Sequence, residues 1–315
     1  MTPFRAAVPM LQRLRRELVD LMEVVLLPGI AALLPWSLCF RLFKRMSHWK
    51  FLYRQSCEKS LAEADKRGFV PDPAAWLAER RLVTLIDHAD HYLTRTRNDA
   101  WMKRHLSVMG DWPAPDQASL QLTFHWGAGM WALRNAQWAH LKAHMLVASV
   151  QGEHFRGRSV FHRYIKARTA SIALALKRPT VDVSISLRPV LKALKVNEQV
   201  IAVIDVPADQ VNASQVVEIL GMQARIPTAL LRLAVDQRTP VSVFTTGIQM
   251  TTGQRHLRIT TLGVYDNLDQ LIQDVFELLE QAIAEQPAAW HFWSESERFF
   301  TPTMPHPTDP TAVDS

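Results

Sequence analysis

The sequence lacks residues and motifs on which several protein classes depend. It contains two cysteines, Cys39 and Cys57, and neither belongs to a Cys-x-x-Cys pair or a Cys/His cluster, so no zinc site is predicted. So few cysteines are consistent with a reducing compartment, and Cys39, in an apolar run, is expected to be a buried thiol. There is no Walker loop, no Gly-x-Gly-x-x-Gly turn and no Gly-x-Ser-x-Gly elbow, and the last absence argues against a serine hydrolase.

The sequence also lacks an uninterrupted hydrophobic run of transmembrane length. Residues 24–40 form an uncharged stretch that is broken by Pro28, Gly29 and Pro35, whereas a spanning helix needs about 20 consecutive apolar residues. No small-residue cleavage site follows, so a secretory signal is not expected. Basic residues on both sides of the stretch favour a membrane-inserted hairpin or an interfacial anchor, and a buried core helix is the alternative.

The composition is otherwise that of a globular protein with a basic balance. Of the 315 residues, 48% are hydrophobic and 21% are charged, which leaves enough apolar residues for a sizeable core. The formal net charge of +6 favours an anionic partner, such as a phospholipid surface, nucleic acid or an acidic carrier protein. Because no clustered Arg/Lys-aromatic pattern or known nucleic-acid motif is present, nucleic acid is not the expected partner.

The hydrophobic pattern alternates between strands and helices after Pro113 and Pro115, which mark a loop. This alternation predicts an α/β fold with a central, mostly parallel or mixed sheet flanked by helices. Strands are expected at 120–124, 145–150, 181–185, 199–205, 215–220, 241–247 and 256–262. Helices are expected at 10–22, within 48–107, and at 127–143, 158–176, 187–195, 227–237 (with Pro227 in its first turn) and 267–285.

The chain is expected to divide into three regions. Residues 1–47 are predicted to be membrane-anchoring helices, because Leu11, Leu14 and Leu18 recur at helical spacing among basic residues. Residues 48–300 are predicted to form the α/β domain. The tail at 301–315 is rich in Pro, Thr and Asp and is expected to be disordered.

The segment FHWGAGMWALR, residues 124–134, is the first candidate for a functional site. His125 follows a predicted strand at its carboxyl end, where ligands bind in open α/β sheets. Gly127 and Gly129 belong to a small-residue turn before a predicted helix, whose free N–H groups could stabilise an oxyanion or a phosphate. A neutral His125 could act as a general base. Arg134, farther along the helix, could hold an anionic group. A histidine that only caps the helix is the alternative.

This segment, together with three later ones, resembles the bacterial lipid A late acyltransferases of the lysophospholipid acyltransferase superfamily. Their signature is a histidine followed by four residues and an acid, often within H-x-G-N-W-E, and His125 and Gly127 match it. Arg134 falls where many members carry an arginine. The later segments are LRPVLKALKVNEQVIAVIDVPAD (187–209), PTALLRLAVDQRTPVSVF (227–244) and AAWHFWSESERFF (288–300). The resemblance runs in order from about residue 20 to 300.

The resemblance implies an acyltransferase at the cytoplasmic face of the cell inner membrane. Such an enzyme moves a fatty acyl group from acyl carrier protein or acyl-CoA to a hydroxyl or amine of a lipid or amphiphile. His125 would be its general base, and no metal or other cofactor would be needed. A lysophospholipid, an aminolipid and a pigment all stay open as acceptors.

One departure from the signature concerns the acid, whose position is taken by Met130. Methionine cannot orient an imidazole or stabilise its charge. Either another carboxylate, such as Asp205 or Glu153, reaches His125, or a backbone carbonyl holds the ring. The third alternative is a non-catalytic lipid-binding or assembly protein on the same fold. Asp205 is the favoured acid, because it follows a predicted strand and falls where the family's later segment carries an aspartate.

Several other residues are weaker candidates. Arg156 and Arg168 belong to a basic stretch that could bind a phosphate or an acidic carrier, or could form a solvated helix face. His140 and His144 are four residues apart but have no evident third ligand, so no metal site is expected. Core positions are expected for Trp131 and Trp138, and membrane-interface positions for Trp290 and Trp293.

Overall fold

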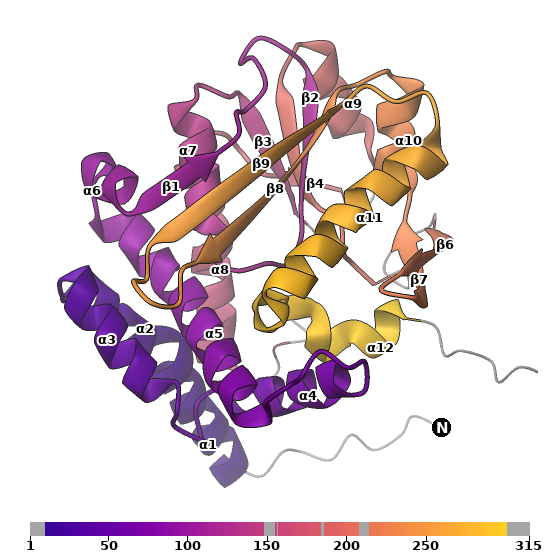
Figure 1. The fold of residues 1–315 in the computed structure, drawn as a ribbon. Helices are drawn as coiled ribbons and strands as arrows, with labels where there is room; N and C mark the ends of the chain where they lie inside the picture. The colour runs from indigo at the N-terminus through magenta and orange to yellow at the C-terminus, as the bar shows by residue number, and fades with distance from the viewer. Residues whose placement is uncertain (1–9, 148–154, 156, 184–185, 208–213, 301–315) are drawn as a thin grey trace, which may run out of the picture.

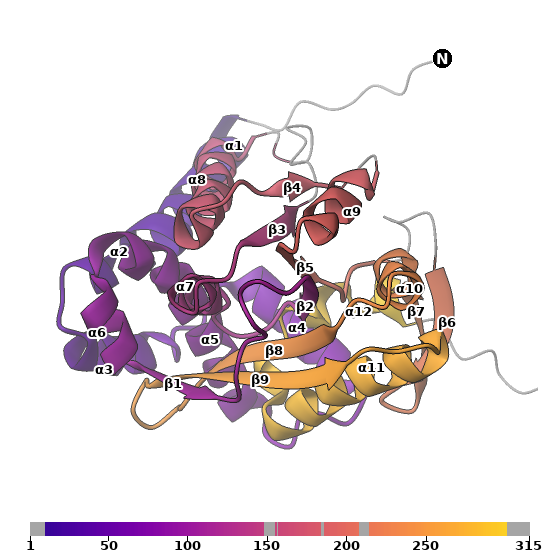
Figure 2. The same cartoon turned by 90° about the horizontal axis from the view of Figure 1, so that it is seen from above.

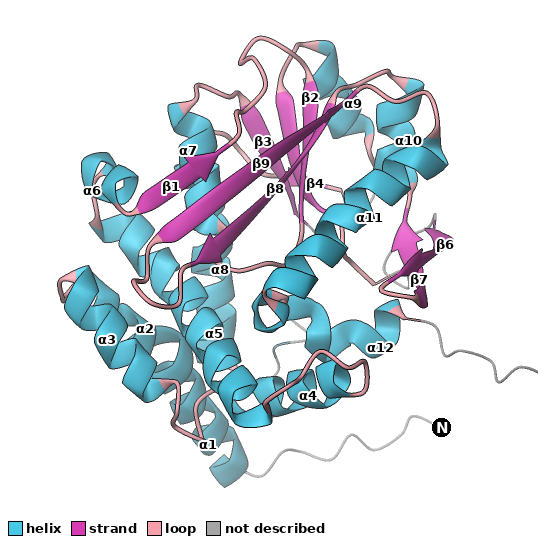
Figure 3. Ribbon diagram, in the orientation of Figure 1, coloured by secondary structure: helices cyan, strands magenta, loops and turns pink. Residues whose placement is uncertain are grey.

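The fold is built on a seven-stranded sheet that has the predicted α/β character (Figure 1). The computed structural model describes residues 10–147, 155, 157–183, 186–207 and 214–300. In spatial order the strands are β1 (Leu106–Met109), β9 (Arg255–Gly263), β8 (Val241–Ile248), β2 (Ser119–Thr123), β5 (Gln199–Val203), β3 (Ala143–Val147) and β4 (Val181–Asp182). Within this sheet only β8 and β9 pair in antiparallel fashion, so the sheet is mostly parallel (Figure 3).

Helices cover both faces of this sheet (Figure 2). One face packs against α9 (Arg188–Lys195), α10 (Ala229–Asp236) and α11 (Leu268–Glu285). The other packs against α5 (Pro73–Thr96), α7 (Met130–Trp138) and α8 (Ser159–Leu176). Neighbouring residues of β5 belong to different hydrophobic clusters, Val200 to the first and Ile201 to the second. A parallel strand buried on both faces explains why the predicted strands read as continuous apolar runs.

The remaining elements extend this core. They are α4 (Arg54–Asp65), α6 (Asp99–Arg104), α12 (Ser296–Phe299), and the antiparallel hairpin of β6 (Ser214–Ile219) and β7 (Met222–Pro227). Short 3₁₀ helices lie at Ile30–Ala32, Pro287–Ala289 and His291–Glu295.

The N-terminal helices lie against α5 and α8, the first of them against α8 (Figure 2). They comprise α1 (Met10–Asp20), a π-helical turn (Leu21–Leu26), α2 (Leu27–Gly29) and α3 (Trp36–Met46). The uncharged run at 24–40 is only partly buried: Cys39 is fully buried, as predicted, whereas Leu33 is 83% exposed. In the part of the chain that the structure describes, no helix has both the length and the apolarity to cross a membrane.

Several predicted boundaries were wrong. The helix expected at 127–143 begins at Met130 and ends at Trp138, because Gly127 has a positive φ of 52° and Ala143 already begins β3. Pro227 ends β7 rather than lying in the first turn of α10, since the unpredicted β7 pairs with β6.

The region 48–107 is not helical to its end, because β1 begins at Leu106. Two of the expected strands, at 145–150 and 181–185, end outside the described residues. The tail at 301–315 lies wholly outside them.

Candidate active site

His125 and Asp205 lie side by side because of the register between β2 and β5. These strands are parallel neighbours, and Thr123 pairs with Val203. Each site residue follows its paired strand residue by two positions, so both lie at the carboxyl edge of the sheet. The sequence predicts that each residue follows a strand, and the strand order makes the two strands neighbours.

The carboxylate of Asp205 holds His125 at two points. Asp205 is completely buried, and its oxygens accept hydrogen bonds from the backbone N–H of His125 at 2.9 and 3.0 Å. Its Oδ1 lies 3.0 Å from the ring Nδ1 of His125. Its Oδ2 accepts a third donor, the indole N–H of Trp290, at 2.8 Å. Of the two carboxylates considered for the missing acid, Asp205 therefore contacts the ring, while Glu153 lies outside the described residues.

The other ring nitrogen of His125, Nε2, is available to accept a proton. The side chain is 43% exposed, and among the described residues no group hydrogen-bonds to Nε2. Burial lowers the pKa of His125, but the charge and hydrogen bonds of Asp205 outweigh it, so the pKa is raised above the ordinary value of 6.5. With Nδ1–H directed at Asp205, a neutral ring presents the lone pair of Nε2 as a base.

Gly127 and Gly129 form the turn between His125 and α7, as predicted. At Gly127 only glycine fits: a Cβ built there would lie 1.9 Å from the carbonyl oxygen of Thr246, and φ is positive. Gly129 is the N-cap residue of α7. Among the described residues no side chain caps the first-turn N–H groups of α7, and the helix dipole favours negative charge at this end.

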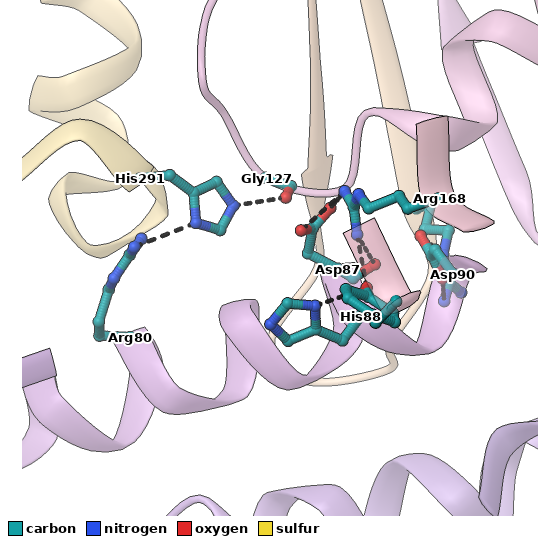
Figure 4. Close-up of polar contacts among 9 residues, drawn as sticks. Arg80, Asp87, His88, Asp90, Gly127, Arg168 and His291 are labelled. Atoms are coloured by element: carbon teal, nitrogen blue, oxygen red, sulfur yellow. Dashed lines mark hydrogen bonds and ion pairs between the residues drawn. The ribbon is translucent and has the colours of Figure 1, made fainter. Parts of the chain in front are cut away.

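The predicted arginines have different positions. Arg168 lies near this edge, in a bidentate ion pair with Asp87 of α5 at 2.7 and 2.9 Å, and also contacts the hydroxyl of Tyr164 (Figure 4). The charge of Asp87 contributes to raising the pKa of His125. Arg134 instead pairs with Asp99 and lines a cavity of about 340 Å³ to which His125 does not belong. Arg156 lies outside the described residues.

The tryptophan candidates and His144 are buried or partly buried side chains. Trp290 and Trp293, predicted at a membrane interface, are both completely buried, so that prediction was wrong. Trp131 is a core residue, as expected, and Trp138 is partly buried. His144 uses both ring nitrogens, on the carbonyl of Pro179 and on Glu198.

Sequence reasoning missed several residues at the site, namely Arg80, Asp87, His291, Phe292 and the indole of Trp290. No local pattern marks them, since each reaches the site from a distant part of the chain. Comparison of the sequence with models of known protein families and with curated proteins finds no match. The function is therefore argued from the geometry of the site.

Proposed function

We propose that this protein is a membrane-associated acyltransferase. It moves a fatty acyl group from acyl carrier protein or acyl-CoA to a hydroxyl or amine of a lipid or amphiphile, in the manner of the family that the sequence resembles. The observation that carries the proposal is the pairing of His125 with Asp205. This pairing supplies, from the segment that follows β5, the carboxylate that the His-x₄-acid signature lacks at Met130.

In this reaction His125 is the general base. Nε2 takes the proton of the acceptor hydroxyl as that oxygen attacks the thioester carbonyl, and Asp205 stabilises the imidazolium that forms. The tetrahedral intermediate carries a negative oxygen, which the uncapped N-terminus of α7 stabilises. Cleavage of the C–S bond then releases the carrier thiolate, which recovers the proton from Nε2.

The membrane association rests on the unusual orientation of α1. A surface helix normally turns its apolar face to the core. Here the polar face docks: Glu17 accepts hydrogen bonds from the N–H groups of Ser159 and Val160, which begin α8, and Asp20 pairs with Arg158 at 2.6 Å.

The apolar face of α1 is turned to solvent. Its large side chains are between 42% and 87% exposed, and the stripe continues into the π-helical turn: Met10, Leu11, Leu14, Leu18, Val19 and Met22. An exposed apolar stripe beside basic side chains fits the interface of an anionic bilayer. In this arrangement the helix lies on the membrane rather than across it.

The proposal is tested by acyl transfer with a matched pair of variants. Purified protein, His125→Asn and His140→Asn are incubated with labelled acyl carrier thioester, or labelled acyl-CoA, and a bacterial lipid extract. His140 is an exposed histidine with a positive φ of 62°, a conformation that asparagine tolerates. We expect lipid acylation that falls by about 10²–10⁴-fold in His125→Asn and is unchanged in His140→Asn.

Two results would count against the proposal. Equal activity in wild type and His125→Asn would refute the role of His125. Binding of lipid without any acylation would favour the alternative suggested by Met130, a non-catalytic lipid-binding protein on this fold.

A further inference from the structure

The short segment at 288–292 contacts both His125 and Asp205. The backbone N–H of His291 donates to the carbonyl of His125 at 2.7 Å. The ring of Phe292 stacks on the ring of His125, with 5.5 Å between centroids. The indole of Trp290 donates to Asp205. Three successive residues therefore each contact one member of the pair.

The ring of His291 makes a polar contact through each of its two nitrogens. Its Nε2 lies 2.8 Å from the carbonyl oxygen of Gly127, and its Nδ1 lies 3.0 Å from Nη2 of Arg80 (Figure 4). Because a guanidinium can only donate, Nδ1 is the acceptor, and Nε2 must carry the hydrogen that binds Gly127. His291 is thus held as one neutral tautomer.

The electrostatic surroundings of His291 keep its ring neutral. Burial, and then the charge of Arg80, lower the pKa of His291 to about 3. Asp87 opposes this change and Arg168 adds to it. His291 therefore stays unprotonated at any pH near neutrality and cannot itself be a base or an acid in the reaction.

Arg80 is dedicated to the same segment. It is 4% exposed, and its Nη1 donates to the carbonyls of Ala288 and Trp290 at 3.1 Å each. Among the described residues no carboxylate hydrogen-bonds to this guanidinium. A buried arginine whose hydrogen bonds go to one short segment, and to His291 within it, serves to fix that segment.

We propose that His291, held by Arg80, is a positioning residue for His125. Through its backbone and its ring it holds the carbonyls of His125 and Gly127, on either side of Trp126, and so fixes the ring of His125 between Asp205 and the acceptor. We call this arrangement of His291 and Arg80 the clamp. It is needed because the acid comes from the segment after β5 rather than from the helix that follows His125. The inference rests on the proposed function of His125.

Two amide substitutions separate the contacts of His291. In His291→Gln the side-chain amide can reach the position of Nε2 and keep the bond to Gly127. In His291→Asn the shorter side chain keeps an acceptor for Arg80 and loses Gly127. His144→Asn is the control, because His144 is also buried and also bonds a backbone carbonyl.

The primary measurement is the titration of the His125 imidazole by ¹H–¹⁵N NMR on the full-length chain, which needs no substrate. We expect the midpoint in His291→Asn to fall towards 6.5, because the ring is no longer aligned with Asp205. His291→Gln and His144→Asn should keep the wild-type midpoint. The kcat for acyl transfer should fall by about 100-fold in His291→Asn, with KM little changed, and should recover in His291→Gln.

The outcomes distinguish the clamp from the proposed function. An unchanged His125 midpoint in folded His291→Asn, or an equal change in His144→Asn, would overturn the clamp even where acyl transfer occurs. The expected titration without any acyl transfer would support the clamp and count against the acyltransferase.

Discussion

At the scale of single residues, the site depends on a carboxylate that is distant in sequence from its histidine. Asp205 is separated from His125 by 80 residues and is completely buried. An ionised carboxylate without partners is costly to bury, but Asp205 accepts three N–H groups, two from His125 and one from Trp290. Its position is therefore fixed before any substrate binds, which suits a residue that orients a base.

Asp205→Asn tests this pairing through the pH dependence of the reaction. In the wild type, kcat/KM should rise with pH through the pKa of His125, which lies above 6.5, because only the neutral ring accepts a proton. In the variant the midpoint should fall, because burial still opposes charge while the carboxylate is gone. The rate should fall by about 10⁴-fold, as for other histidines that lose their carboxylate.

The raised pKa of His125 also predicts how the stability of the fold depends on pH. Since the folded pKa of His125 is above its unfolded value, its protonation stabilises the fold below about pH 6.5. This contribution is lost as the pH rises through the folded pKa, and in Asp205→Asn it should be absent. Urea unfolding across this window measures it, and an identical pH dependence in both proteins would contradict the pairing.

At the scale of elements, α5 connects the N-terminal helices with the sheet. Pro73 occupies its first turn, and the side chain of Asp72 caps it by accepting from Ala74 and Ala75. Farther along, Asp90 forms a fully buried ion pair with Arg255 of β9. The guanidinium of Arg255 lies 4.1 Å from the ring centroids of both Trp36 and Trp131. One arginine thus joins α3, α5, α7 and β9.

We expect Arg255→Met to destabilise the protein by about 3–5 kcal/mol, because it leaves the Asp90 carboxylate buried without its partner. Chemical denaturation measures the change. Arg54→Met is the matched control, since Arg54 pairs with Glu58 on the surface, where such a pair contributes about 0–1 kcal/mol. A similar small effect for both substitutions would mean that Arg255 does not join these elements.

At the scale of the whole molecule, α8 links the apolar stripe of α1 to the candidate site at His125. Glu17 of α1 meets the first N–H groups of α8, and the same helix carries Arg168, which pairs with Asp87 near His125. In the proposed function, α8 therefore connects the helix that lies on the bilayer with Arg168, whose partner Asp87 contributes to the pKa of His125. This arrangement suits an acceptor that stays in the membrane.

Binding to vesicles tests the exposed stripe. Wild-type protein should sediment with vesicles of anionic phospholipid, and the double variant Leu14→Glu, Leu18→Glu should bind at least about tenfold less, because each leucine loses roughly 1.5–3 kcal/mol of apolar burial. Leu174→Glu is the control, since Leu174 is 67% exposed on α8 and lies outside the stripe. Equal binding by all three proteins would exclude α1 as the contact.

The sequence alone determined the α/β class, most strands and helices, and the candidates His125, Asp205, Gly127 and Gly129, because these follow from patterns within a few residues. It did not determine which distant side chains contact one another. Strand order and register brought Asp205 to His125, and contacts across 211 residues joined Arg80 to His291. Only the tertiary structure shows that Arg134 pairs with Asp99 and that the apolar face of α1 is exposed to solvent. Amphipathic spacing predicts that a helix has two faces, but which face is buried depends on groups such as those of α8, far along the chain.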